Sequence, residues 1–98
     1  MFIAIVDFQT SAADRPAALA QLDKERDEVR AMPGNLAFRI YESREDQHHV
    51  TLVHEWTDEA SFAGYQASES FVRSGAVLRP LMTGAPTSRR FRAEILEV

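Results

Sequence analysis

The hydrophobic periodicity of this chain switches between strand and helix in an order that few folds can satisfy. Residues 2–8, 35–43, 48–56 and 88–97 have the apolar runs or the alternation typical of strands. Residues 15–31 carry apolar side chains at helical spacing, and a second helical region bears Phe62 and Tyr65 and resumes after Ser68 as far as Leu81. This β-α-β-β-α-β order predicts a ferredoxin-like α+β fold, a four-stranded antiparallel sheet with its helices on one face.

Turn-forming and capping residues divide these segments at the expected places. Pro33-Gly34 ends the first helix, and Gly84 and Pro86 end the second helical region. Side chains that can cap the helices precede each of them. The expected N-caps are Asp14, Thr57 or Asp58, and Ser68.

The strand at residues 2–8 is apolar on both of its faces. Phe2 and Val6 lie on one face, and Ile3 and Ile5 lie on the other. Two helices can cover only one face of the sheet, so the other apolar face stays uncovered, and a second copy of the sheet is the simplest cover. We therefore expect residues 1–98 to form a single domain that works as a homodimer, because a chain this short buries a modest core alone.

Composition excludes several classes of function. The absence of cysteine removes disulfides, thiolate metal sites and cysteine nucleophiles, and the net charge of −4 argues against nucleic acid as a partner. No apolar run reaches the ~20 residues of a membrane helix, and the first strand lacks a signal-peptide pattern, so we expect no membrane partner and a cytoplasmic protein. The arginines that concentrate in residues 71–98 indicate either surface and inter-subunit ion pairs or an anion-binding patch.

Known catalytic motifs are missing, which leaves an aromatic cluster around one histidine. The chain has no phosphate-binding glycine loop, no nucleophile elbow and no metal-spaced histidines, so we expect no metal. His54 shares a strand face with Trp56 and is either a satisfied interior or interface histidine or a catalytic base. Trp56 and Tyr65 combine an aromatic ring with a polar handle and can line a pocket for a flat ligand.

Other side chains near this cluster allow two interpretations each. Phe62 and Phe71 belong either to the hydrophobic core or to the pocket wall. Arg39 and Tyr41 share one face of the strand at 35–43, where they contact a partner subunit or contribute to a cleft. The periodicity does not separate these alternatives.

The segment Glu55-Trp56-Thr57-Asp58-Glu59-Ala60, followed by Phe62, Tyr65, Ser68 and Phe71, resembles the signature of antibiotic biosynthesis monooxygenase domains. Pro33-Gly34 upstream and Leu78-x-Pro80-Leu81 downstream fit the same resemblance, which spans nearly the whole chain. It implies a dimeric α+β barrel with a pocket between sheet and helices in each subunit. Relatives of this kind oxidise aromatic polyketides or quinols with molecular oxygen and use no metal or flavin, so the resemblance implies no cofactor.

The chain departs from the family pattern at several pocket positions. Tyr65 replaces the helix histidine of the signature. Leu52, Phe62 and Ala76 stand where the polyketide-oxidising branch has an asparagine, a tyrosine and an arginine. Val6-Asp7 and Ser74-Gly75 replace the asparagine and histidine of the haem-degrading branch, so the resemblance does not extend to haem degradation. A shared fold survives such losses, but a shared reaction need not.

Two functional hypotheses follow, with a third structural one behind them. The first is a cofactor-independent monooxygenase, an oxidoreductase acting on a phenolic, quinol or polyketide-like small molecule. In it His54 and Tyr65 are the catalytic residues, and the substrate-binding residues are Trp56, Arg39, Phe62 and Phe71. The alternative is a non-catalytic dimer that binds a small molecule in the same pocket, and the third is a dimer that serves only as an interaction module.

Overall fold

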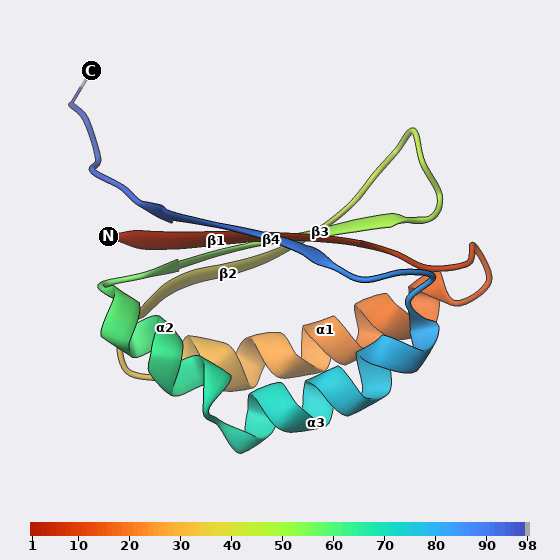
Figure 1. Cartoon of the computed structure of the whole chain (residues 1–98), viewed down its shortest axis with the longest axis horizontal. Helices are drawn as coiled ribbons and strands as arrows, with labels where there is room; N and C mark the ends of the chain where they lie inside the picture. Colours follow the sequence, from red (N-terminus) through yellow and green to blue (C-terminus); the bar gives the residue numbers. More distant parts are fainter. Residues whose placement is uncertain (98) are drawn as a thin grey trace.

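Four strands form one antiparallel sheet in the computed structural model, which describes residues 1–97 (Figure 1). They are β1 (Phe2–Gln9), β2 (Asn35–Glu42), β3 (His49–Trp56) and β4 (Thr87–Arg92). The order across the sheet is β2-β3-β1-β4, so β1 pairs with β3 on one side and with β4 on the other. The first strand in the sequence is therefore held in the interior of the sheet by the last strand.

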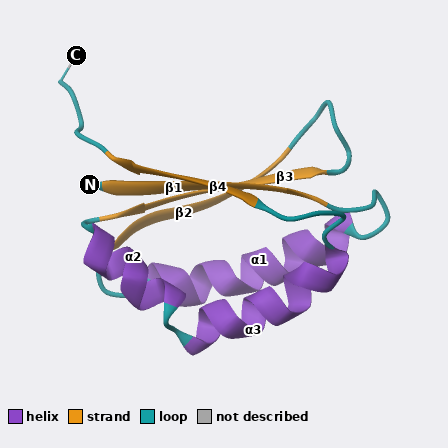
Figure 2. Ribbon diagram, in the orientation of Figure 1, coloured by secondary structure: helices purple, strands orange, loops and turns teal. Residues whose placement is uncertain are grey.

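All helices lie on one side of this sheet (Figures 1 and 2). They are α1 (Arg15–Arg30), α2 (Glu59–Gln66) and α3 (Glu69–Leu78), followed by the 3₁₀ turn η1 (Arg79–Leu81). The predicted ferredoxin-like fold with helices on one face is confirmed, and the second helical region is divided in two. None of the helices within residues 1–97 has the length and apolar character needed to cross a membrane.

The division between α2 and α3 has a local cause. Ser68 takes an extended conformation, with φ −79° and ψ 155°, and its hydroxyl accepts a hydrogen bond from the Phe71 N–H at 3.2 Å. The Asp58 carboxylate caps α2 in the same way by accepting from the Ser61 N–H at 2.8 Å. Both predicted caps thus satisfy backbone donors that the first turn of a helix leaves unpaired.

Strand alternation places the core between the sheet and the helices. On β3 every second side chain, from Val50 through Leu52 and His54 to Trp56, is buried on the helix side. The matching residues of α1 face them, because Ala18, Leu22 and Val29 recur on one side of that helix and are fully buried.

Two local predictions are wrong, and a third is confirmed in position only. β2 contains a bulge at Leu36, which pairs with no residue of β3 and is 54% exposed, so Leu36 does not join Phe38 and Ile40 on the helix side. β4 ends at Arg92 rather than at residue 97, because β1 begins at Phe2 and the pairing stops after Ala93 exchanges backbone hydrogen bonds with Met1 at 2.7 and 2.8 Å. Asp14 occupies the N-cap position of α1, but its side chain makes no capping bond there.

The Pro33-Gly34 turn depends on the absence of a side chain at Gly34. Gly34 has φ +81°, and a Cβ atom there would lie 2.2 Å from Ser61 Oγ. We expect Gly34→Ala to lower the free energy of unfolding by about 2 kcal/mol or more, because backbone strain and a steric clash add up. Thermal and denaturant unfolding measure this loss.

Gly64 provides the matched control for this substitution. It lies inside α2, and apart from the helix's own backbone no atom of residues 1–97 comes within 4 Å of the position its Cβ would take. Gly64→Ala should raise stability by about 0.5–1 kcal/mol, since alanine loses less backbone entropy in a helix. Equal effects of the two substitutions would contradict this account of the turn.

Candidate functional site

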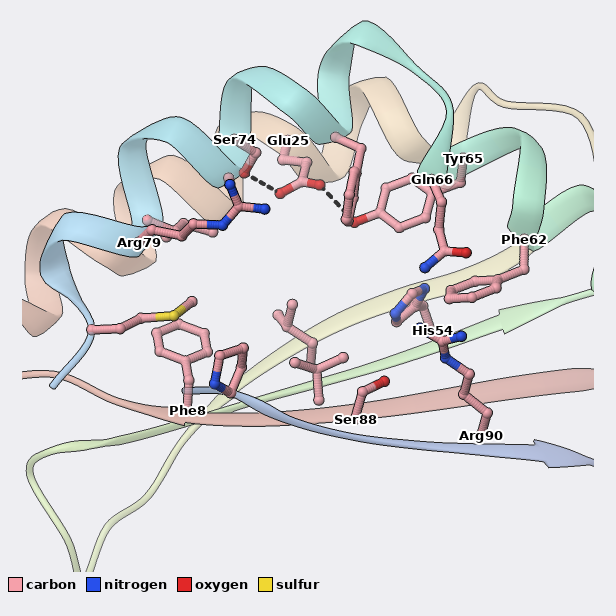
Figure 3. Close-up of a pocket in the computed structure, with 17 residues that line it drawn as sticks. Phe8, Glu25, His54, Phe62, Tyr65, Gln66, Ser74, Arg79, Ser88 and Arg90 are labelled. Atoms are coloured by element: carbon pink, nitrogen blue, oxygen red, sulfur yellow. Dashed lines mark hydrogen bonds between the residues drawn. The ribbon is translucent and has the colours of Figure 1, made fainter. Parts of the chain in front are cut away.

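A partly enclosed cavity of about 200 Å³ lies between the sheet and the helices, beneath the junction of α2 and α3 (Figure 3). Strands β1, β3 and β4 form its floor, and side chains from all three helices form its roof and ends. Most of the lining is apolar. The apolar lining residues are Val6, Phe8, Leu52, Phe62, Phe71, Leu78, Met82 and Pro86.

His54 presents one defined nitrogen to this cavity. The Trp56 indole Nε1–H donates to His54 Nδ1 at 2.9 Å, so Nδ1 is the unprotonated nitrogen of the ring. A neutral imidazole with a bare Nδ1 carries its proton on Nε2. Within residues 1–97 no protein group accepts a hydrogen bond from Nε2. No side-chain nitrogen or oxygen in this range is both fully shielded and without a partner, so Nε2 must be accessible. Because His54 lines the cavity, its Nε2–H reaches the open space there.

Burial holds His54 in the neutral form. Desolvation, with a smaller contribution from the positive charge of Arg90, lowers the pKa of its imidazole to about 4. The ring is 2% exposed and packs against Phe38, Phe62 and Tyr65 at centroid distances of 5.4–5.6 Å. At neutral pH His54 is therefore a hydrogen-bond donor to a ligand in the cavity rather than a cation.

Two further side chains make this end of the cavity polar. Figure 3 shows the Gln66 amide and the Arg90 guanidinium beside the His54 ring. The Arg90 Cζ lies 5.0 Å from the centre of the Phe62 ring, a cation–π distance that fixes the guanidinium over the aromatic wall. The cavity thus has a donor-rich end suited to an oxygen atom of a ligand.

A carboxylate occupies the roof of the cavity. Glu25 comes from α1 and is 4% exposed; its Oε1 accepts from the Tyr65 hydroxyl at 2.8 Å, and its Oε2 accepts from the Ser74 hydroxyl. Burial raises the pKa of Glu25, and the two hydroxyl hydrogen bonds oppose this shift. Burial and the neighbouring Glu25 charge raise the pKa of Tyr65, so the phenol keeps its proton and donates it.

Comparison with known proteins places this architecture in a family. The family model described as antibiotic biosynthesis monooxygenase matches residues 1–75, which run from β1 into α3. The chain belongs to the antibiotic biosynthesis monooxygenase family. Ser88 and Arg90 of β4, which also line the cavity, lie outside the matched range. No curated protein sequence matches the chain.

Several solved structures share this fold over nearly the whole length of the chain. A structure described as an antibiotic biosynthesis monooxygenase has a TM-score of 0.88 at 20% identity, covering 97% of this chain and 100% of that one. Rv0793 from Mycobacterium tuberculosis has a TM-score of 0.87 at 21% identity, with coverage of 98% and 96%. A conserved protein from Methanosarcina mazei Go1 has a TM-score of 0.89 at 18% identity, with coverage of 96% and 94%. At these identities the likeness concerns the fold.

The cavity of this family member brings together four of the six site residues expected from the sequence. They are His54, Tyr65, Phe62 and Phe71. Trp56 is fully buried behind His54 and is not part of the lining. Arg39 lies on the other face of the sheet, where its guanidinium pairs with Glu55 at 2.8 Å. Arg39 is directly opposite Val53 in the β2–β3 pair, and both side chains point away from the helices. Strand alternation therefore keeps Arg39 out of this cavity.

Several polar residues of the site were not expected from the sequence. They are Glu25, Gln66, Ser74, Arg79, Ser88 and Arg90. The position of Glu25 could have been found from the sequence. It follows Leu22 by three residues and precedes Val29 by four, and this helical spacing puts its carboxyl on the buried face of α1. Arg90 carried no such signal, because its contact with Phe62 of α2 arises only when β4 pairs with β1. Within residues 1–97 no three acidic, histidine or cysteine side chains are grouped to hold a metal ion.

The buried neutral His54 predicts a specific acid instability. In the unfolded chain the imidazole takes up a proton near its ordinary pKa of 6.5, whereas in the folded chain it does so only near 4. The free energy of unfolding therefore keeps its full value above pH 6.5. It falls as the pH drops towards 4, by about 3 kcal/mol at most, because the unfolded chain binds the proton more tightly. Urea unfolding of wild type and His54→Gln across this range measures the difference. Parallel pH curves for the two proteins would disprove it.

Proposed function

We propose that this family member oxidises a small phenolic, quinol or polyketide-like molecule with molecular oxygen, using no metal or flavin. The observation that carries the proposal is the apolar cavity closed at one end by the neutral His54 Nε2–H. Apolar walls with a few convergent polar groups are typical of sites for flat organic ligands. At about 200 Å³ the cavity suits a molecule of one or two rings rather than a larger one.

The proposed reaction uses the substrate as its own electron source. An electron-rich phenol that loses its hydroxyl proton passes one electron to O₂, and the resulting radical and superoxide combine into a carbon–oxygen bond. Loss of water from the peroxide then leaves a carbonyl, so that a phenol with a free ring position and O₂ give a quinone and water. Orientation and stabilisation of the phenolate are the two contributions required from the protein.

Residues at the two ends of the cavity divide these contributions. His54 Nε2–H donates to the developing phenolate oxygen, and the Arg90 guanidinium adds positive charge at the same end. Phe62 and Phe71 hold the ring of the substrate between them and exclude water. Tyr65 provides a hydroxyl at the roof of the cavity, next to Glu25.

Oxygen uptake with a panel of quinols and phenols tests the proposal. We expect substrate-dependent uptake by the wild type and a fall of about 100-fold in kcat/KM for His54→Ala, the usual cost of one oxyanion donor. His48→Gln is the matched control and should leave the rate unchanged, since His48 is exposed at the β2–β3 turn. Tight binding of a phenol without any oxygen uptake would favour the non-catalytic binding function, which the apolar Leu52 and Phe62 in the lining also fit.

We also propose that the chain assembles as a homodimer through the sheet face opposite the helices. Ile5 and Val53 are cross-strand partners at the centre of that face, and Phe91 on β4 is 42% exposed beside Ile3. The ion pair Arg39–Glu55 lies on the same face. An apolar centre with charged groups around it resembles the composition of a protein interface.

Sedimentation near neutral pH tests the assembly. We expect a dimer for the wild type and a monomer for Ile5→Arg, because an unpaired charge at the centre of an interface is costly. Val72→Arg is the matched control, since Val72 is 65% exposed on α3 and lies outside the proposed interface. A stably folded wild-type monomer at micromolar concentration would contradict the proposal.

A further inference from the structure

Glu25 separates two hollows of the molecule. On one side it lines the internal cavity; on the other it lines a depression of about 160 Å³ at the outer surface between α1 and α3. The outer depression is polar and bears Lys24, Glu28, Ser70 and Arg73. The carboxyl of Glu25 is thus the one acidic group within residues 1–97 that both hollows share.

The carboxylate is retained without a charged partner. Within residues 1–97 no lysine, arginine or histidine nitrogen lies within 4.0 Å of it, and its only donors are the Tyr65 and Ser74 hydroxyls. Burying a charge with neutral donors alone costs free energy that a leucine at the same position would not. A group kept at such a cost, in a cavity wall, indicates a chemical role.

His54 does not fill the role of proton acceptor. Its Nδ1 already accepts from Trp56, and its Nε2 carries the proton that faces the cavity. Among residues 1–97, Glu25 is the only acidic residue that lines the cavity, and Tyr65 connects it to the space where a substrate would lie (Figure 3). A phenol that must ionise therefore finds its acceptor at the roof.

We propose that Glu25 is the terminal proton acceptor of this site, with the Tyr65 hydroxyl as the relay between substrate and carboxylate. The inference rests on the proposed oxidation of a phenol. The substrate O–H bond breaks as its proton joins the Tyr65 oxygen, and the Tyr65 O–H bond breaks as that proton joins Glu25 Oε1. The products are a phenolate, an unchanged tyrosine and a neutral carboxylic acid, and no electron moves in this step.

The surroundings of Glu25 suit a group that gains and loses a proton. The pKa of its carboxyl is raised by burial and also by the negative charge of Glu28, which brings a carboxylic acid closer to the pH at which it can act as a base. Water in the outer depression takes the proton from Glu25 after each turnover, while Ser74 keeps the carboxyl oriented. The charged and titratable residues that line the two hollows with it are Lys24, Glu28 and Arg73 on the outer side and His54, Tyr65, Arg79 and Arg90 in the cavity, where the Arg79 guanidinium lies on the helix side (Figure 3).

Binding of 4-nitrophenol, whose ionised form absorbs at a longer wavelength, tests the acceptor without any turnover. At a pH one unit below the pKa of the free ligand, roughly a tenth of the free molecules are ionised. We expect more than about half of the bound ligand to show the phenolate band in the wild type. In Glu25→Gln the phenolate fraction should fall at least about 5-fold, and Tyr65→Phe should lower it similarly, because the bound phenolate then loses the Tyr65 hydroxyl that links it to Glu25 by hydrogen bonds.

Asp23→Asn is the matched control for Glu25→Gln. Asp23 is an exposed carboxylate on α1 that touches neither hollow, so its removal should leave the phenolate band unchanged. Thermal unfolding confirms that each variant is folded before its spectrum is compared.

The outcomes separate this inference from the proposed function. A phenolate band of equal size in wild type and Glu25→Gln overturns the acceptor role and leaves phenol binding intact. A band lost in Glu25→Gln but kept in Tyr65→Phe overturns the relay, since Glu25 would then take the proton directly. Absence of any 4-nitrophenol binding by the folded wild type overturns both the inference and the proposed substrate class.

Discussion

The two-residue alternation of β3 connects the hydrophobic core of this protein to its candidate site. It turns Val50, Leu52, His54 and Trp56 to the helix side, where the aliphatic residues and the indole pack and the imidazole meets the cavity. The same alternation lets Trp56 reach back two residues and hold His54 in one tautomer. A shift of one residue in this strand would bury Thr51 and Glu55 instead and remove both core and site.

Inside the cavity the polar groups are few, and each has a defined direction. The His54 Nε2–H and the Arg90 guanidinium favour negative charge at one end, while Glu25 holds negative charge at the roof with the help of Tyr65 and Ser74. Apolar walls weaken the screening between them, so each exerts a larger effect than it would in water. A neutral molecule that can release a proton towards the roof and hold charge at the donor end matches this arrangement.

The two faces of the sheet have different surroundings, since the helices cover one face and leave the other open. Side chains that point to the helices build the core and the cavity, whereas their neighbours in sequence, such as Ile5, Arg39 and Val53, point to the other side. This explains how Arg39, one residue from the buried Phe38, is separated from the site by the thickness of the sheet. Strands β1, β3 and β4 thus line the cavity on one face of the sheet and form part of the candidate subunit interface on the other.

Local periodicity was enough to predict the order of elements, the caps at Asp58 and Ser68, and the place of His54, Phe62, Tyr65 and Phe71 near one another, because strand and helix spacing decide which side chains share a face. It failed at Leu36, where a bulge changes the face, and beyond Arg92, where the partner strand β1 reaches its first residues. The partners of Glu25 and the position of Arg90 were decided by tertiary structure alone. Tyr65 and Ser74 lie 40 and 49 residues from Glu25, and only the packing of α1 against α2 and α3 brings two hydroxyls to one buried carboxylate.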